Sequence, residues 1–334
     1  MNSSILETEA AISFVKDCFE SHLTGALSLI KVSSPIAVLE GTGINDDLNG
    51  IERPVSFPVK SLGEKRAQVV HSLAKWKRLR LMQLGIDCGS GIITDMRALR
   101  PDEDYTCLHS IYVDQWDWEQ VIQVDQRDLT RLCSTVESIY NALRSTEREI
   151  SFRYPSIKPV LPQNITYIHS QELLEMYPAL TPKERETMAA RKFGAIFIIG
   201  IGGLLSNGEP HDGRAPDYDD WSTLNRDGYY GLNGDIIVWH PVLECALELS
   251  SMGIRVNRES LVSQLEQKGC KERLDLMFHK MLMNNLLPQS IGGGIGQSRV
   301  CMFMLKKRHI GEVQVGIWSD HQRLELSKAG VELL

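Results

Sequence analysis

The sequence predicts an α+β fold with a mostly antiparallel β-sheet flanked by helices. Apolar residues at Ile12, Val15, Phe19 and Leu23 follow helical spacing, and helices are also expected over 132–143 and 258–287. Strands are expected around residues 29–32, 67–71, 92–99, 110–118, 165–169, 195–199, 235–240, 250–256 and 313–318. These strands do not alternate regularly with helices, as they would in a parallel α/β array, and this favours antiparallel pairing.

Composition narrows the class of protein. The 334 residues carry a formal net charge of -7, with 24% charged and 43% hydrophobic residues, as in an ordinary soluble protein. An acidic balance argues against a broad nucleic-acid surface, and no apolar run reaches the roughly 18 residues of a membrane helix. The chain shows no repeat and no linker, so one domain over 1–334 is expected. Seven scattered cysteines without a C-x-x-C pair, and an acidic N-terminus unlike a signal peptide, predict reduced thiols and a cytoplasmic location.

A polar row is expected on one face of the strand near 110–118. Side chains alternate across a strand, so Gln115, Asp117 and Glu119 share one face while Trp116 and Trp118 take the other. The aromatic face fits a core. The polar row fits either a solvated edge or the floor of a polar pocket, and the pattern alone leaves both open.

Cations occur where an anionic ligand would explain them. Ser72 is expected to cap a helix whose first turns carry Lys75 and Lys77, an arrangement that opposes the helix macrodipole. Arg100 follows a predicted strand, and its planar guanidinium suits a phosphate or a carboxylate. A surface salt-bridge cluster is the alternative for Arg100.

The glycine run at 292–296 precedes a predicted helix over 297–305. Glycines allow a ligand to approach the backbone closely, and Arg299 lies in the first helical turn, where a phosphate or nucleotide would stabilise it. The run lacks the Lys-Ser/Thr ending of a P-loop and the strand–loop–helix setting of a dinucleotide site.

Carboxylates complete the candidate chemistry. Asp235, Glu248 and the run 217–220 lie in apolar or loop contexts, and such hard oxygen ligands suit Mg2+. Helix and turn capping is the alternative, above all for Asp220.

Several runs together resemble one family, the ammonia-dependent asparagine synthetases or aspartate–ammonia ligases. The longest are His-Ser-Leu-Ala-Lys-Trp-Lys-Arg at 71–78, Tyr-Val-Asp-Gln-Trp-Asp-Trp-Glu at 112–119 and Ile-Gly-Gly-Gly-Ile-Gly-Gln-Ser-Arg at 291–299. Further runs lie at 98–104, 214–223, 232–236 and 248–256. The family is similar to the catalytic core of class II aminoacyl-tRNA synthetases, above all the aspartyl type, which implies an antiparallel sheet flanked by helices.

The resemblance implies roles for individual residues. It implies that Arg100 holds the α-phosphate of ATP and that Arg299 packs against adenine. It also implies that Lys77 and Arg255 clamp the side-chain carboxylate of the substrate and hold it for in-line attack. It places Asp46 near the ammonia and assigns Asp46, Arg100 and Gln115 to catalysis. The implied aspartate-binding residues are Ser72, Lys77, Gln115, Asp117, Ser251 and Arg255. The implied nucleotide-binding residues are Arg100, Asp219, Asp235, Glu248, Gly294 and Arg299, with Asp235 and Glu248 as ligands of Mg2+.

The activity implied by the resemblance is ATP-dependent conversion of aspartate and ammonia to asparagine, AMP and pyrophosphate through β-aspartyl-AMP, in a homodimer. Free ammonia is the expected donor, because Met1 is followed by Asn2 and not by the N-terminal cysteine of glutamine-dependent enzymes. Two alternatives are an aspartyl-tRNA synthetase-like paralogue that charges another acceptor and a non-catalytic regulator. The acidic charge opposes the first. The presence of Lys77, Arg100, Asp117, Glu248 and Arg299 opposes the second.

Overall fold

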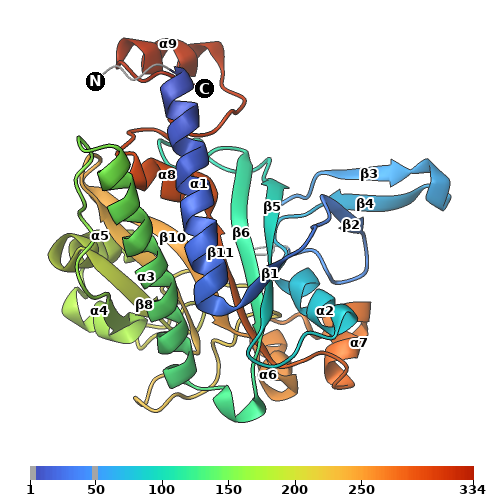
Figure 1. The fold of residues 1–334 in the computed structure, drawn as a ribbon. Coiled ribbons are helices and arrows are strands. Elements are labelled where there is room, and N and C mark those ends of the chain that lie inside the picture. Colours follow the sequence, from blue (N-terminus) through green and yellow to red (C-terminus); the bar gives the residue numbers. More distant parts are fainter. Residues whose placement is uncertain (1–4, 47–51) are drawn as a thin grey trace.

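The computed structural model describes residues 5–46 and 52–334, and a large sheet forms its centre (Figure 1). The strand order is β1 (Leu29–Lys31), β5 (Gly91–Leu99), β6 (Tyr112–Val121), β11 (Ser290–Gly296), β10 (Cys245–Ile254), β9 (Asn233–His240), β8 (Ala195–Ile199) and β7 (Thr166–His169). The pairs from β5 through to β8 are antiparallel, and only the outer pairs β1–β5 and β7–β8 are parallel. The predicted α+β class with a mostly antiparallel sheet is therefore confirmed.

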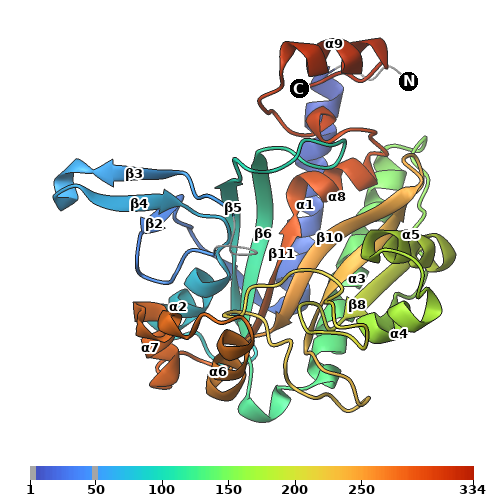
Figure 2. The same ribbon diagram turned by 180° about the vertical axis from the view of Figure 1, so that it is seen from behind.

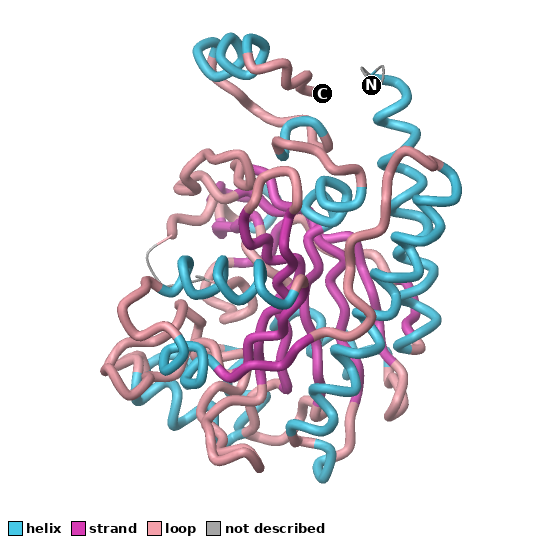
Figure 3. Tube along the Cα trace, turned by 90° about the vertical axis from the view of Figure 1, so that its left-hand side faces the viewer, coloured by secondary structure: helices cyan, strands magenta, loops and turns pink. Residues whose placement is uncertain are grey.

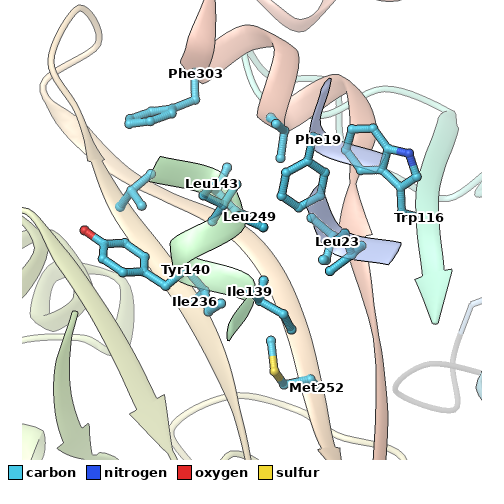
Figure 4. Packing of buried hydrophobic residues seen from close by; sticks show 14 of the residues in the cluster. Phe19, Leu23, Trp116, Ile139, Tyr140, Leu143, Ile236, Leu249, Met252 and Phe303 are labelled. Atoms are coloured by element: carbon cyan, nitrogen blue, oxygen red, sulfur yellow. The ribbon is translucent and has the colours of Figure 1, made fainter. Parts of the chain in front are cut away.

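Three helices cover one face of this sheet: α1 (Ile5–Leu27), α3 (Leu129–Arg153) and α8 (Gln297–Met304). In the side view of Figure 3, α1 runs down from the N mark along one side of the strands. Figure 4 shows Phe19 and Leu23 of α1 beside Trp116 of β6, and the rings of Phe19 and Trp116 have centroids 4.7 Å apart. The aromatic face of β6 is thus the core, as predicted.

The opposite face is covered only in part. Helix α2 (Ala74–Leu84) packs on β6 and β11, and α5 (Pro182–Phe193) packs on β9 and β10 (Figure 2). A smaller sheet of β2 (Ala37–Leu39), β4 (Lys65–Val69) and β3 (Ser56–Val59) projects beyond α2. The remaining helices are α4 (Ser170–Met176), α6 (Arg258–Gln267), α7 (Met277–Met283) and α9 (Asp320–Lys328), with 3-10 turns at Lys60–Leu62, Val124–Gln126, Lys271–Asp275 and Ile310–Glu312. No helix within the described ranges is both long and apolar enough to cross a bilayer.

Strand β10 contains a bulge that changes which residues face the core. Its register against β9 shifts between Glu248 and Ser250. Leu247, before the shift, and Leu249, at the bulge itself, are core residues, and after the bulge Met252 and Ile254 are. Residues separated by an odd number of positions across the bulge can therefore share a face.

Two predicted elements differ from the structure, and one strand of the large sheet was not predicted. Residues 313–318 form no strand, because Val315 and Ile317 point into solvent and the segment pairs with no neighbouring strand. Strand β11, which contains the glycine run, was not predicted, since glycine is uncommon inside strands. The helix expected over 258–287 is broken after α6, where Gly269 adopts a left-handed conformation with φ of 66°.

Candidate functional site

A cavity of about 520 Å³ opens on the face of the sheet opposite α1 and α3. Every residue to which the sequence analysis assigns a role lines it: Asp46, Ser72, Lys77, Arg100, Gln115, Asp117, Asp219, Asp235, Glu248, Ser251, Arg255, Gly294 and Arg299. Segments from Asp46 to Arg299 in the sequence therefore meet at one site.

The floor of the cavity is a ladder of paired residues. Asp117 on β6 pairs with Gly294 on β11, which pairs with Ser251 on β10, which pairs with Asp235 on β9. Directly opposed residues in an antiparallel sheet point to the same face. Asp117 is 3% exposed and the adjacent Glu119 is fully buried, so the polar row on β6 is the floor of a pocket and not a solvated edge.

The glycine run makes room for polar side chains of the neighbouring strand. A Cβ atom at Gly294 would overlap the amide oxygen of Gln115. A Cβ at Gly292 would overlap the Glu119 carboxylate and lie 2.7 Å from Nη2 of Arg255. These glycines lie in a regular strand, and their missing side chains let Gln115 and Glu119 lie across β11.

Lys77 is a buried cation at this floor. Its Nζ contacts the Asp117 carboxylate and donates a hydrogen bond to the carbonyl oxygen of Gly293 at 2.8 Å. Burial lowers the pKa of the Lys77 ammonium, against the attraction of Asp117. The site thus holds a charge that is costly to bury and that a second anion would stabilise.

Helix α2 presents Lys77, but Ser72 does not cap it in the way the sequence predicts. The helix begins at Ala74, and its N-cap position is occupied by Leu73, which makes no side-chain cap bond. Ser72 Oγ instead accepts a hydrogen bond from the Ala74 amide at 3.1 Å. The prediction was wrong by one residue because Leu73 is buried in the core and takes the turn position.

Arg255 forms a second buried cationic group. Its Nε donates to Glu119 Oε1 at 2.9 Å, its Nη2 donates to Oε2 at 2.7 Å, and its Nη1 contacts Asp219. Ser290 Oγ donates to Glu119 Oε1 at 2.7 Å. Burial would raise the pKa of Glu119, but the Arg255 guanidinium outweighs it and holds that pKa below the usual range. The guanidinium is therefore fixed in one orientation beside the pocket.

Asp235 and Glu248 lie beside a cation that the sequence analysis did not single out. Arg214 Nη2 donates to Asp235 Oδ1 at 2.6 Å, and Nη1 contacts Ser251. Burial and the nearby Glu248 charge raise the pKa of Asp235 to about 6 in spite of Arg214. Arg299, Lys183 and Arg214 hold the pKa of Glu248 low against burial. Arg214 lies in the resembling run 214–223, but its long loop offers no periodicity that would reveal its partner.

Arg299 follows β11 in the first turn of α8, as predicted. Its Nη1 donates to the Glu248 carbonyl oxygen at 3.1 Å, and its Nη2 donates to His109 Nε2 at 2.8 Å. His109 Nδ1 lies 2.8 Å from Thr106 Oγ1, which accepts its proton. Burial and the Arg299 charge lower the pKa of His109 to about 4, so its ring is a neutral acceptor. His109 was not predicted as a site residue from the sequence.

Arg100 differs from the other cations of the cavity. Its Nη2 lies 3.4 Å from the carbonyl oxygen of His71, and its buried Nε has no hydrogen-bond partner in the part of the chain that the structure describes. Within residues 5–46 and 52–334 it forms no ion pair, whereas Lys77, Arg214, Arg255 and Arg299 each face a carboxylate. Its charge remains available to an anion.

Asp46 reaches the cavity from the loop predicted over 41–50, of which residues 47–50 lie outside the described residues. Asp46 is 3% exposed. Its amide donates to Asn45 Oδ1 at 3.0 Å, and its carbonyl oxygen accepts from His71 Nδ1 at 3.1 Å. The backbone that carries the carboxylate is therefore held on both sides.

Similar structures show the fold. Asparaginyl-tRNA synthetase from Pyrococcus horikoshii, complexed with asparaginyl-adenylate, superimposes with a TM-score of 0.68 at 14% identity over 93% of this chain and 70% of that one. Aspartyl-tRNA synthetase from Entamoeba histolytica gives a TM-score of 0.62 at 14% identity over 94% of this chain and 59% of that one. The fold is that of the class II aminoacyl-tRNA synthetases.

Sequence comparison shows the family. The aspartate-ammonia ligase family model matches residues 6–330. An aspartate–ammonia ligase from Parabacteroides distasonis is 54% identical over 331 residues, which cover 99% of this chain and 96% of the relative. One from Clostridium perfringens is 53% identical over 331 residues, with the same coverage. The chain therefore belongs to the aspartate–ammonia ligase family.

Proposed function

We propose that this protein joins ammonia to the side-chain carboxylate of L-aspartate at the expense of ATP. Aspartate attacks the α-phosphorus, pyrophosphate leaves, and ammonia then attacks the β-aspartyl-AMP to give asparagine and AMP. The observation that carries the proposal is the separation of two cationic groups in one cavity. Lys77 and Arg255 lie at one end, and Arg100, which forms no ion pair among the described residues, lies at the other.

The separation gives the two carboxylates of aspartate different places. Arg255 binds Glu119, whereas Arg100 pairs its backbone with Ile111, beyond the other end of β6. Glu119 and Gln115, four residues apart on β6, are separated by about 14 Å along the strand at roughly 3.4 Å per residue. We infer that Lys77 and Arg255 hold the α-carboxylate, which does not react, and that the β-carboxylate extends towards Arg100. This differs from the role that the resemblance implies for Lys77 and Arg255, which is a clamp on the side-chain carboxylate. Gln115 and Asp117 then lie where they receive the α-ammonium.

The cations at the nucleotide end supply charge where it develops. Two anions must meet in the first step, and Arg100 and Arg299 stabilise the phosphoryl oxygens as pyrophosphate leaves. Because Arg299 is already held by the Glu248 carbonyl oxygen and His109, it needs little reorganisation during the reaction. Within the described ranges Arg100 has no counter-ion that it would have to release before it binds a phosphate.

Asp235 and Glu248 fit a Mg2+ site. Their carboxylates line one cavity from adjacent strands, and the raised pKa of Asp235 reflects burial and the repulsion between them. No cluster of three or more His, Cys, Asp or Glu side chains suited to a metal occurs in the described part of the chain. Two carboxylates match Mg2+, which keeps several waters and bridges to nucleotide phosphates. Bound there, Mg2+ would neutralise phosphate charge.

Asp46 is the carboxylate best placed for the second step. Asp46 lines the same cavity as Arg100 and Lys77, and it is nearly excluded from water. A carboxylate there attracts ammonium and accepts the proton that ammonia must lose. Exclusion of bulk water protects the acyl-adenylate from hydrolysis.

We also propose a cytoplasmic homodimer. The first helix and strand expose Leu6 at 78% and Ile30 at 57%, apolar side chains that a second copy would cover. Light scattering of the purified protein tests the dimer independently of activity.

Isotope transfer gives the sharpest test of the reaction. The protein is incubated with ATP, Mg2+, ammonium and aspartate labelled with 18O in the β-carboxylate, and AMP and asparagine are analysed by mass spectrometry. One 18O atom should pass to AMP, and label in the α-carboxylate should not pass. Glutamine in place of ammonium is the control for the nitrogen donor. ADP as the product, transfer of label from the α-carboxylate, or a requirement for tRNA would refute the proposal.

A further inference from the structure

A buried charged cluster supports the cavity from behind. Asp217 Oδ2 accepts hydrogen bonds from Lys75 Nζ at 2.9 Å and His279 Nε2 at 3.0 Å, and Arg273 Nη1 lies 3.4 Å away. The side chains of Lys75, Asp217 and His279 are at most 2% exposed, and none of these three residues lines the cavity. The Lys75 and His279 partners hold the pKa of Asp217 well below its usual range in spite of burial. We refer to Lys75, Asp217 and His279 as the Asp217 cluster.

The Asp217 cluster joins two walls of the site. Lys75 lies two positions before Lys77 on α2, and Asp217 directly precedes Tyr218 and Asp219, both of which line the cavity. Buried ion pairs contribute little net stability but are costly to break on one side. Such a cluster therefore fixes the relative position of the segments that it connects.

His279 also contacts the loop that carries Asp46. Gly43 has φ of 73°, and a Cβ there would lie 2.9 Å from His279 Nδ1. The next contact along α7 is a hydrogen bond from the Phe278 amide to the Thr42 carbonyl oxygen at 3.1 Å. Ile44 is buried in the same apolar cluster as Phe278. Helix α7 thus supports the loop at Gly43, three residues before Asp46.

The two segments that His279 holds meet again inside the cavity. Tyr218 and Asp46 both line the cavity. Burial is the largest cause that raises the pKa of Tyr218, and the negative charge of Asp46 is the second. On one side His279 binds Asp217, next to Tyr218. On the other side it packs against Gly43, close to Asp46. The imidazole therefore spans the base of the gap between these segments.

We propose that His279 is a positioning residue for the ammonia step, setting the distance between Asp46 and the segment 217–219. The proposal rests on the proposed function, because it assumes that Asp46 serves the ammonia half of the reaction. His279 touches no substrate. It acts through the hydrogen bond to Asp217 and the contact with Gly43, so its loss should affect ammonia more than ATP or aspartate.

The test compares His279→Leu with His279→Gln and His240→Leu. His279→Leu should raise KM for ammonium on the order of 10-fold or more, because small displacements of reacting groups have effects of this size or larger. KM for ATP and aspartate should stay within about twofold of wild type, since the groups assigned to them keep their own partners. His279→Gln retains a donor for Asp217 and should recover most of the loss. His240 is equally buried, lies outside the cavity and is the control for removing a core histidine.

Four results would overturn the proposal: an unchanged KM for ammonium in folded His279→Leu, an equal rise of all three KM values, an equal effect in His240→Leu, or no recovery in His279→Gln. If His279→Leu does not fold, Gly43→Ala provides the measurement, because its methyl group presses on the same contact from the loop side. An unchanged KM for ammonium in that variant also refutes the proposal. Absence of asparagine from the wild-type protein would instead refute the proposed function, so the two failures are distinguishable.

Discussion

Replacing Glu119 by Gln tests whether the fixed guanidinium of Arg255 is the basis of aspartate binding. Glu119 is fully buried and accepts hydrogen bonds from Nε and Nη2 of Arg255 and from Ser290 Oγ. Gln preserves the shape but removes the charge, and its NH2 group faces other donors. The variant therefore keeps the Arg255 side chain but weakens the ion pair that fixes its orientation.

The expected loss follows from the contacts. Removing one charge of a buried ion pair costs about 3–5 kcal/mol. Arg255 keeps its contact with Asp219, so the lower limit of about 3 kcal/mol applies. At about 2 °C per kcal/mol for a large chain, the melting midpoint should fall by roughly 6 °C. A guanidinium that no longer faces aspartate loses a charge-assisted bond of about 1.5–3 kcal/mol, which raises KM for aspartate on the order of 10-fold to 100-fold.

Thermal melting and steady-state kinetics measure the two effects separately. Glu325→Gln is the matched control, because Glu325 pairs with Lys328 at 2.8 Å but both side chains are more than half exposed. Exposed pairs contribute about 0–1 kcal/mol, so this variant should behave as wild type. If Glu119→Gln has the melting midpoint of the wild type and the same KM for aspartate, the buried ion pair does not position Arg255 for aspartate binding.

Arg100→Gln should lower kcat on the order of 100-fold and leave the melting midpoint unchanged, since Arg100 forms no ion pair among the described residues; kinetics and melting of one sample decide this. Gly292→Ala should cost about 1–3 kcal/mol in chemical denaturation because its Cβ overlaps a buried carboxylate, whereas Gly25→Ala meets open space and should cost nothing. The pKa of His109 is lowered from 6.5 to about 4, so protons bind the unfolded chain more readily. The wild type therefore loses stability as pH falls from 6.5 to 4. The difference in melting midpoint between the wild type and His109→Gln should become smaller over this range.

The floor of the site could be predicted because it depends on strand alternation. Trp116 and Trp118 mark the buried face of β6, so Gln115 and Asp117 must share the other. What the sequence could not decide was whether that face met solvent or a pocket, since this depends on helix α2 and on loops far away in the chain. Asp117 is buried against Lys77, so this face of β6 lies in a pocket and not in solvent.

Residues held by irregular segments escaped prediction. Arg214 reaches Asp235 from a long loop, and it fits only because Gly202 lacks a side chain that would lie 2.7 Å from the Arg214 Cβ. His109 lies in the turn before β6, and its partner is 190 positions away. No local periodicity describes such contacts, because they arise when the whole sheet closes and brings the loops together.

The bulge in β10 shows that some of this long-range geometry does leave a local trace. Apolar residues occupy Leu247 and Leu249, and then Met252 and Ile254, so the apolar phase shifts by one residue. Strict alternation would place Glu248 and Ser251 on opposite faces of the sheet. The extra residue turns both of them into the cavity, and Arg255 follows in the same phase. Glu248, the candidate Mg2+ ligand, and Arg255, the candidate carboxylate clamp, can therefore lie along one strand segment. A shift in the alternation of polar and apolar residues within a predicted strand can thus indicate a functional site.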